Sequence, residues 1–259
     1  MSSFTISTEE KSSSTSDVTS YAGPDVHSSS LEYAARFSGA IGKWLLDKQL
    51  AAVKTILEGA QVKTILDIGG GHAQIAPYLI DMGYEVVVLG SASCCSLQLS
   101  SLIDQGKIEF RVSELTKLPF QDKSIDAVIC LRQICHLENW RELSAEAHRV
   151  AKQMIILDYP PKVSFNALYL LMFPIKKWFE GNTRTFKIFS HSEVRATFES
   201  NGWRLHKKFP QFFLPIVMHR ALKRVRLSEF LERICYRLRL TSLFGSPVIV
   251  SFIINNSQL

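Results

Sequence analysis

A run of glycines ends an apolar, β-branched stretch in residues 62–77, which read VKTILDIGGGHAQIAP. Because glycine has no Cβ, Gly69 and Gly71 can take positive φ and let the backbone come close to a bound molecule. The segment that follows, 73–82, is compatible with a helix, and the start of a helix presents unpaired N–H groups. This order of strand, tight turn and helix predicts a ligand-binding turn.

The spacing of the glycines separates the classes of ligand-binding turn. A dinucleotide-binding fingerprint needs glycine at the first, third and sixth positions, but the sixth position counted from Gly69 is Gln74. A phosphate-binding P-loop needs Gly-Lys-Ser or Gly-Lys-Thr, which does not follow the turn. What the turn does contain is an acid two positions before the first glycine, in the pattern Asp67-x-Gly69-x-Gly71.

That pattern resembles the first motif of class I S-adenosylmethionine-dependent methyltransferases. In this family the acid lies near the methionine end of the cofactor and the glycines pass beneath it, which implies the same positions for Asp67 and the turn. On the turn alone, a glycine turn in some other α/β protein is the alternative interpretation.

Two later segments agree with the resemblance. Within residues 113–126, an acid, a Leu-Pro-Phe sequence and a Ser-x-Asp pair follow one another as they do in the family. The family's acid accepts a hydrogen bond from the adenine amino group and the next backbone N–H reaches a ring nitrogen, so the resemblance gives these roles to Glu114 and Leu115. Residues 131–137, LRQICHL, stand where the family has a loop that ends in a similar Leu/Cys-x-His.

The resemblance implies S-adenosyl-L-methionine as the cofactor. The residues that it assigns to the cofactor are Asp67, Gly69, Gly70, Gly71, Gly90, Ser91, Glu114, Leu115 and Arg132. Gly90 departs from the family, in which the second strand usually ends in an Asp or Glu that chelates both ribose hydroxyls. A lost charged hydrogen bond is worth about 1.5 to 3 kcal/mol. Ser91, Ser93 or a backbone carbonyl would compensate in part; otherwise the site binds the cofactor weakly or not at all.

Methyl transfer requires proximity and orientation, with a base where the acceptor carries a proton. His136 is the candidate base, because it lies on a loop at the end of a strand and is expected to face the cleft. The alternative is a histidine that positions a neighbour by hydrogen bonding. Asp158 and Tyr159, after the fifth strand, are candidates for lining the acceptor site.

Strands and helices alternate through the middle of the chain, which indicates a doubly wound parallel α/β sheet. The resemblance implies a Rossmann-like methyltransferase fold with seven strands, mostly parallel. After the first strand, strands are predicted at 85–89, 108–112, 125–131, 153–157, 203–208 and 247–254, and helices at 96–103, 140–151 and 191–201. Ligands of such sheets bind beyond the carboxyl ends of the strands, so the residues after each strand are expected to form one site.

Composition and pattern also predict the domain organisation. Residues 1–30 begin with a Ser/Thr-rich stretch that contains acidic residues and are predicted to be a mobile tail. Residues 31–259 are predicted to form a single methyltransferase domain. Within it, 31–60 is a predicted N-terminal helical segment, and 161–190 and 209–245 are predicted helical insertions.

The segment before the first strand is predicted as a helix over 31–59 that is broken near Gly39 and Gly42. It either packs across the edge of the sheet or forms a lid, as the corresponding segment often does in the similar family. The lid residues that would touch cofactor or substrate are Tyr33, Arg36 and Phe37.

The insertions supply aromatic residues that suit an apolar acceptor such as a quinone precursor, a polyketide-like ring or a lipid. These aromatic residues are Phe165, Tyr169, Phe173, Trp178, Phe179, Phe212 and Phe213. The alternative is that they form the core of the added helices.

The net charge of +6 is concentrated near the C-terminus. Residues 203–239 hold ten Lys/Arg and two Asp/Glu, a local balance of +8, so the remainder of the chain sums to −2. The run 219–240 mixes arginines with apolar residues, which suits either peripheral contact with an anionic membrane surface or a solvated helix face. Nucleic-acid binding is not expected, because no recognised binding module accompanies the charge.

The five cysteines show no paired CxxC spacing, so neither a disulfide framework nor a metal site is indicated. The chain begins without the apolar core of a secretory signal, and a cytoplasmic location is the default expectation. The sequence thus predicts a methyltransferase similar to the ubiquinone/menaquinone C-methyltransferase relatives, acting on a small, largely apolar acceptor. The alternative is a non-catalytic binding or scaffold protein that keeps the fold, with Gly90 as its sequence trace.

Overall fold

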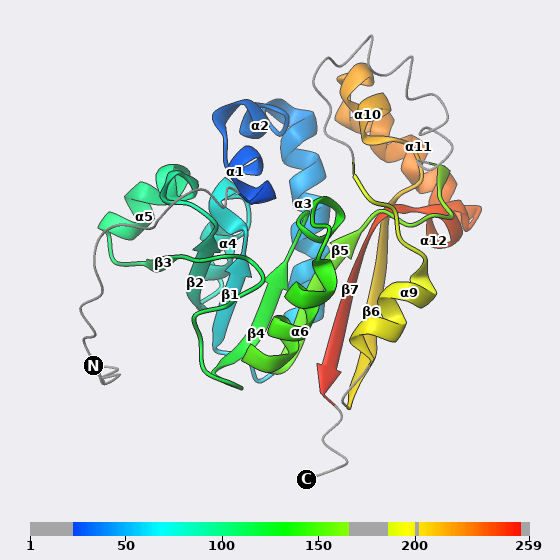
Figure 1. The fold of residues 1–259 in the computed structure, drawn as a ribbon. Helices are drawn as coiled ribbons and strands as arrows, with labels where there is room; N and C mark the ends of the chain where they lie inside the picture. The colour runs from blue at the N-terminus through cyan, green and yellow to red at the C-terminus, as the bar shows by residue number, and fades with distance from the viewer. Residues whose placement is uncertain (1–22, 166–185, 200–201, 255–259) are drawn as a thin grey trace.

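The computed structural model describes residues 23–165, 186–199 and 202–254. Its centre is a seven-stranded sheet with the strand order β3-β2-β1-β4-β5-β7-β6 (Figure 1). The strands are β1 (Thr64–Ile68), β2 (Glu85–Gly90), β3 (Ile108–Val112), β4 (Ile125–Cys130), β5 (Ala151–Tyr159), β6 (Trp203–Phe212) and β7 (Ser246–Ile254). Strands β1 to β5 pair in parallel, and β7 lies antiparallel between β5 and β6. The predicted seven-stranded, mostly parallel fold is confirmed.

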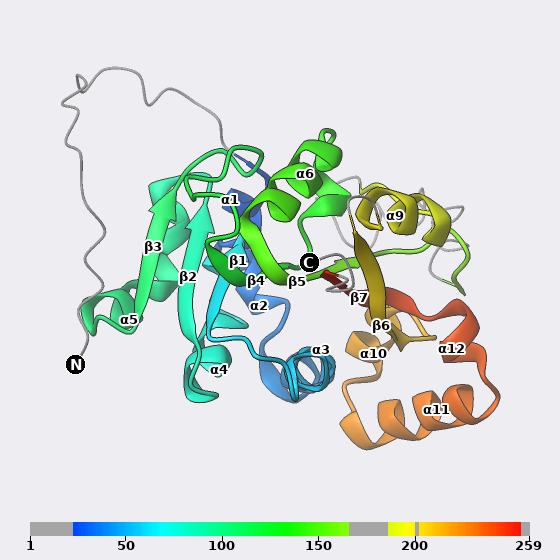
Figure 2. The same cartoon turned by 90° about the horizontal axis from the view of Figure 1, so that it is seen from below.

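Helices cover both faces of the sheet, as Figures 1 and 2 show. One apolar layer joins the sheet to α3 (Gly39–Leu57), α4 (Ala76–Asp81) and α5 (Ser100–Asp104). The layer on the other face includes α6 (Trp140–Val150) and α9 (His191–Phe198). The remaining helical elements are α1 (Pro24–Ser28), α2 (Leu31–Ala35), α10 (Ile216–Leu222), α11 (Val225–Arg237), α12 (Leu240–Phe244) and the 3-10 turns η1 (Gly70–His72), η2 (Ser93–Leu99) and η3 (Ile134–His136).

The N-terminal segment differs from the prediction of a mobile tail over 1–30. Residues 1–22 lie outside the described residues, but 24–28 form the helix α1. Pro24 stands in its first turn, where the fixed φ of proline suits the start of a helix. The tail prediction is therefore wrong for this part of the chain, where Asp25 and Ser28 are buried. The predicted break near Gly39 is present, because α2 ends before it and α3 begins at Gly39.

The helix predicted over 73–82 begins later than expected. Ala73 has a left-handed backbone with φ +53°, and Pro77 lies in the first turn of α4. A proline has no N–H for the hydrogen bond to an earlier turn, so the helix cannot extend far back through this position. The helix predicted over 96–103 is likewise divided, into the 3-10 turn η2 and the short α5.

The two predicted insertions are described to different extents. Much of 161–190, with the aromatic positions Tyr169, Phe173, Trp178 and Phe179, lies outside the described residues. In 209–245, β6 continues to Phe212 before α10, α11 and α12 follow. Glu232 on α11 ties them to the sheet, because its carboxylate accepts hydrogen bonds from Phe213 N (3.0 Å) and from the buried His219 Nε2 (3.0 Å).

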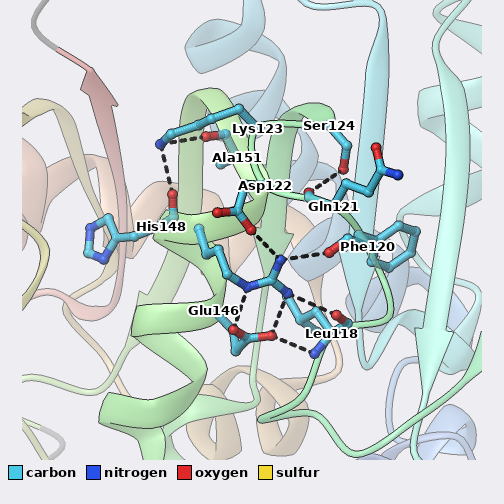
Figure 3. A network of polar contacts seen from close by, with 10 residues as sticks. Leu118, Phe120, Gln121, Asp122, Lys123, Ser124, Glu146, His148 and Ala151 are labelled. Carbon is cyan, nitrogen blue, oxygen red and sulfur yellow. Dashed lines mark hydrogen bonds and ion pairs between the residues drawn. The ribbon is translucent and has the colours of Figure 1, made fainter.

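A second polar network fixes the Leu-Pro-Phe segment to α6 (Figure 3). Arg149 donates to the carbonyls of Leu118 (2.9 Å) and Phe120 (2.7 Å). It also forms ion pairs with Glu146 (2.7 Å) and Asp122 (2.8 Å). The Glu146 carboxylate in turn accepts from Leu118 N (2.8 Å). This part of the motif therefore serves the structure by holding the loop after β3 against the helix.

Within the described ranges, the longest apolar helical stretches fall short of what crossing a bilayer requires.

Candidate functional site

The carboxyl ends of β1, β2, β4 and β5 meet at one edge of the sheet, where α1 packs against η1 and η2. The glycine turn begins there with Gly69, whose φ of +71° is a conformation that favours glycine. Gly69 N donates to Leu89 O (2.8 Å), which fastens the turn to the end of β2. The structure therefore places the predicted turn at the predicted edge.

Side chains of the protein lie directly on the turn. A Cβ at Gly71 would collide with Cys95 O and with Ser29 Oγ, and a Cβ at Gly69 would collide with the side chain of Gln133. Gln133 is fully buried and donates from Nε2 to Gly69 O (3.1 Å). The turn is thus a close-approach site that α1 and the loop after β4 cover in this conformation.

Asp67, at the end of β1, is buried beside the turn, and a Cβ at Gly70 would collide with its carboxylate. Burial raises the pKa of Asp67 to about 7, and the nearby Arg132 opposes this rise only in part. A carboxyl group with such a pKa is held at an energetic cost when it is ionised, and it is stabilised by any cation that reaches it. Both properties suit a site for a positively charged ligand group.

Arg132 follows β4 with a left-handed backbone, φ +60°, and its N–H donates to the Asp158 carboxylate. Its guanidinium lies 3.3 Å from His72 Nε2 and 4.9 Å from the centre of the Phe37 ring. Burial and the charge of Arg132 lower the pKa of His72, so the imidazole is neutral and can accept this hydrogen bond. The structure thus places Arg132 beside the glycine turn, and its assignment to the cofactor stays a prediction.

Tyr33 and Phe37, which were predicted lid residues, both lie against the Arg132 guanidinium. Arg36 instead lies over the Tyr33 ring, with 5.5 Å between its guanidinium and the ring centre. The segment before the first strand therefore contacts the site through its aromatic rings.

Gly90 has a steric reason to be glycine. A Cβ there would lie 2.7 Å from Phe110 Cζ and 2.8 Å from Cys95 Cβ. A carboxylate side chain at the end of β2 would displace both residues, so the ribose-binding acid of the similar family cannot occupy this position without repacking.

The next residue, Ser91, is instead held by the N-terminal segment. Ser91 N donates to Asp25 Oδ2 (2.7 Å), and Ser91 Oγ accepts from Gly23 N (2.8 Å). The thiol of the buried Cys95 lies 3.3 Å from the same Asp25 oxygen. The exposed Cys94 precedes it. The segment 23–28 is therefore fastened to the end of β2 by polar contacts.

The predicted adenine-binding positions follow β3 at the same edge. Ser113 N donates to Gly90 O (3.0 Å), which brings Glu114 and Leu115 next to the end of β2. Leu115 is fully buried, whereas Glu114 is partly exposed and pairs with Lys117 at 3.1 Å. These positions leave the Glu114 carboxylate accessible.

The predicted base and the two predicted acceptor-lining residues lie in three different settings. His136 ends the turn η3, is half-buried, and its N–H donates to Gln133 O (2.9 Å). Tyr159 donates or accepts a hydrogen bond with His191 Nδ1 (2.8 Å) on the side that faces α9. Asp158 lines a small cavity next to Arg132, and burial raises its pKa to about 6.

That cavity, of about 50 Å³, has mostly apolar walls. It is lined by Phe37, Leu45, Gln49, Arg132, Asp158, Gln211, Phe212, Ile216, Pro247 and Ile249. Of the predicted aromatic lining, Phe212 is therefore present, while Phe165 and Phe213 pack against each other with ring centres 5.3 Å apart. Pockets for small molecules typically measure about 300 to 1,000 Å³, so an acceptor of that size requires the cavity to widen.

A sequence profile described as a methyltransferase domain matches residues 66–155. The matched segment begins in β1, includes the glycine turn and ends in β5. The chain contains a segment of the methyltransferase-domain family. This match confirms the methyltransferase resemblance that the glycine turn and the two later motifs carry.

Solved structures share the fold of this methyltransferase domain and its additions at low identity. An S-adenosylmethionine-dependent methyltransferase of Thermotoga maritima, described as a possible histamine N-methyltransferase, is 16% identical with a TM-score of 0.58, over 86% of this chain and 95% of that one. Magnesium protoporphyrin IX methyltransferase of Synechocystis is 13% identical with a TM-score of 0.57, over 86% and 92%.

The cyclase SpnF has the same fold with a TM-score of 0.55 and 15% identity, over 82% and 80% of the two chains. Because a cyclase and methyltransferases share it, the fold alone does not fix the reaction. The comparison with curated protein sequences gives no match.

The residues around the turn of the methyltransferase domain fit the cofactor of its class. Several buried polar atoms here have no hydrogen-bond partner among the described residues. They are Asp25 Oδ1, Ser29 Oγ, Asp67 Oδ2, Gln74 Oε1, Arg132 Nε and Nη1, and Gln133 Oε1. Buried polar groups are nearly always satisfied, so such a cluster indicates a polar ligand with both donors and acceptors. Its entry requires that Ser29 and Gln133 move off the glycines.

Sequence reasoning missed Asp25, His72 and Gln133. Asp25 falls within residues 1–30, the predicted tail. The sequence Gly23-Pro24-Asp25 nevertheless carries a signal for a helix start, with proline at the first position and an acid in the first turn. No sequence pattern marks Gln133, because its role depends on a contact between segments 64 positions apart.

Proposed function

We propose that this protein transfers a methyl group from S-adenosylmethionine to a small, largely apolar acceptor. The observation that carries the proposal is the cluster of unpartnered, buried polar atoms around the glycine turn, next to a cavity with apolar walls. A quinone, a polyketide-like ring and a lipid are the acceptor classes that suit those walls.

Named residues would hold the parts of the cofactor. Arg132, whose Nε and Nη1 atoms have no partner among the described residues, suits the methionine carboxylate, and Asp67 suits the ammonium group. Glu114 and the N–H of Leu115 suit the adenine edge. When bound, the cofactor supplies an electrophilic methyl group on a sulfonium. The protein would orient that group, and the rings of Tyr33 and Phe37, which lie against the Arg132 guanidinium, would shield it from water.

A proton acceptor near the cavity is Asp158. Its carboxyl group lines the cavity, and a pKa of about 6 leaves it ionised near neutral pH while it remains basic enough to take a proton. His136, the base expected from the sequence, is not among the described residues that line this cavity. We therefore assign the proton-accepting role to Asp158 and keep His136 as a positioning residue.

Calorimetry with S-adenosylmethionine and S-adenosylhomocysteine tests the proposed function. Both ligands are expected to release or absorb measurable heat with the folded protein and to raise its melting temperature by mass action. Absence of binding with either ligand, for protein that is folded by circular dichroism, would favour the alternative of a non-catalytic binding or scaffold protein.

We also propose that the protein works in the cytoplasm, at least partly at a membrane surface, through α11. Three apolar side chains on its outer face are exposed, Leu227 by 37%, Phe230 by 57% and Ile234 by 40%. Exposed arginines flank this stripe at Arg226, Arg233 and Arg237. In Figure 2, α11 lies at the periphery of the molecule. An apolar stripe bordered by cations complements a bilayer surface that contains anionic lipid.

Vesicle cosedimentation tests this contact. The protein is expected to bind vesicles that contain phosphatidylglycerol, and binding should weaken as salt is added, because exposed charges are screened. Replacing both Phe230 and Ile234 with serine should reduce binding at least tenfold, since each buried apolar side chain contributes about 1.5 to 3 kcal/mol. Leu97→Ser, at an exposed apolar residue of η2, is the matched control and should leave binding unchanged. Equal binding to neutral and anionic vesicles would dismiss the proposal.

A further inference from the structure

Position 90 cannot provide the carboxylate that other proteins of this class place at the end of their second strand. Phe110 and Cys95 occupy the space into which a side chain would extend. A ribose bound beyond β2 would still present two hydroxyl donors in a site removed from water. An acceptor must then come from another part of the chain, or binding is weak.

Asp25 brings a carboxylate to the same end of β2 from the opposite direction. Its Oδ2 accepts from the N–H of Ser91, the residue after Gly90, at 2.7 Å. Cys95 donates its thiol to the same oxygen, and the carbonyl of Cys95 lies against Gly71 in the glycine turn. The Asp25 carboxylate therefore contacts the residue that follows the strand end. It also contacts Cys95, which touches the glycine turn.

One of the two carboxylate oxygens of Asp25 still lacks a donor. The residue is fully buried, and its Oδ1 has no hydrogen-bond partner among the described residues. Among the residues that the structure describes, no lysine, arginine or histidine forms an ion pair with Asp25. A buried carboxylate is costly unless its oxygens are hydrogen-bonded, and vicinal hydroxyls are suitable donors because they can reach a single carboxylate together.

Resting on the proposed function, we propose that Asp25 is the ribose-binding acid of this protein and replaces the acid absent at position 90. α1 is then a part of the cofactor site that originates before the matched domain. The competing interpretation is that Asp25 only latches α1 over the turn and must withdraw before a cofactor enters. The two interpretations predict opposite effects of removing the charge.

Calorimetry of the full chain with S-adenosylhomocysteine and with its 2′-deoxy and 3′-deoxy analogues separates them. The wild type is expected to bind each deoxy analogue about 10- to 100-fold more weakly, the range for a lost hydrogen bond to a charged group. Asp25→Asn should bind S-adenosylhomocysteine more weakly by a similar factor and should distinguish the analogues by less than about threefold. Asp47→Asn, at an exposed aspartate of α3, should behave as the wild type.

The outcomes separate this proposal from the proposed function. No binding of S-adenosylhomocysteine by the wild type refutes the proposed function and this proposal with it. Binding by the wild type that is equal or tighter in Asp25→Asn overturns only the role of Asp25 and supports a latch. Thermal unfolding of the ligand-free variant verifies its fold. Should that variant not fold, the wild type decides alone, because equal affinities for S-adenosylhomocysteine and both deoxy analogues overturn the proposal.

Discussion

Replacing Asp67 with asparagine is expected to stabilise the ligand-free protein by about 2 to 4 kcal/mol at about pH 8. The reason is that burial raises the pKa of this carboxyl group to about 7 from its ordinary 3.8. Ionisation therefore costs free energy in the folded protein that it does not cost in the unfolded chain. Asparagine has nearly the same shape and carries no charge.

The sign of the pH dependence follows from the raised pKa of Asp67. Well below its ordinary pKa of 3.8 the group is protonated in both states and costs nothing. As the pH rises towards 7, the unfolded chain loses the proton first, and the free energy of unfolding of the wild type falls. Asp158, whose pKa is raised to about 6, adds to this fall. Chemical denaturation between pH 4 and pH 8 should show a gain for Asp67→Asn that grows with pH.

The same substitution should weaken S-adenosylhomocysteine binding at least tenfold, because the ligand's ammonium group loses its charged partner. Asp67→Asn would then be more stable and less functional, the trade-off expected where a site retains a costly charge. Asp47→Asn removes an exposed carboxylate and should change neither property by more than about 0.5 kcal/mol. Lower stability of Asp67→Asn at every pH would show that the carboxylate has a partner in the folded protein.

Replacing Arg149 with alanine is expected to lower the free energy of unfolding by about 3 kcal/mol. Its guanidinium bonds two carboxylates and the carbonyls of Leu118 and Phe120. Glu146 has the pKa of its carboxyl group lowered chiefly by its hydrogen bond with Arg149, so it would remain ionised without its main partner. The expected loss lies well below the sum of the separate bonds, because the Arg149 side chain is 30% exposed.

The matched control is Arg141→Ala on the same helix. Arg141 is 62% exposed and reaches Glu193 at 3.3 Å, so its loss should cost at most about 0.5 kcal/mol. Urea titrations followed by tryptophan fluorescence compare the two variants. Equal midpoints would mean that the loop after β3 is held by its apolar contacts and not by the network.

The fold was predictable because it depends on short-range patterns. Buried parallel strands such as β4 read as apolar runs with few interruptions, and the glycine turn between β1 and α4 has a local sequence signature. Local helix boundaries were less predictable. The helix after the turn is predicted to begin at residue 73. The left-handed backbone of Ala73 and the proline at 77 move its start to Ala76.

The site was predictable only where a strand end marks it. Asp67 is the last residue but one of β1 and Arg132 is the second residue after β4, so the topology of the sheet brings them together. Asp25 reaches Ser91 across 66 positions, a contact that no local pattern specifies. Its segment begins next to a serine-rich stretch whose composition alone suggests disorder. Tertiary contacts, and not propensity, order it.

The neighbouring cysteines of η2 differ in a way that is of practical use. Burial, with the adjacent Asp25 carboxylate, raises the pKa of Cys95 to about 12, so this thiol hardly forms the reactive thiolate. Cys94 is the exposed member of the five cysteines. A maleimide dye would attach there first, close to the segment 23–28 that is fastened to the end of β2, and its emission would report any movement of that segment in real time without a catalytic assay.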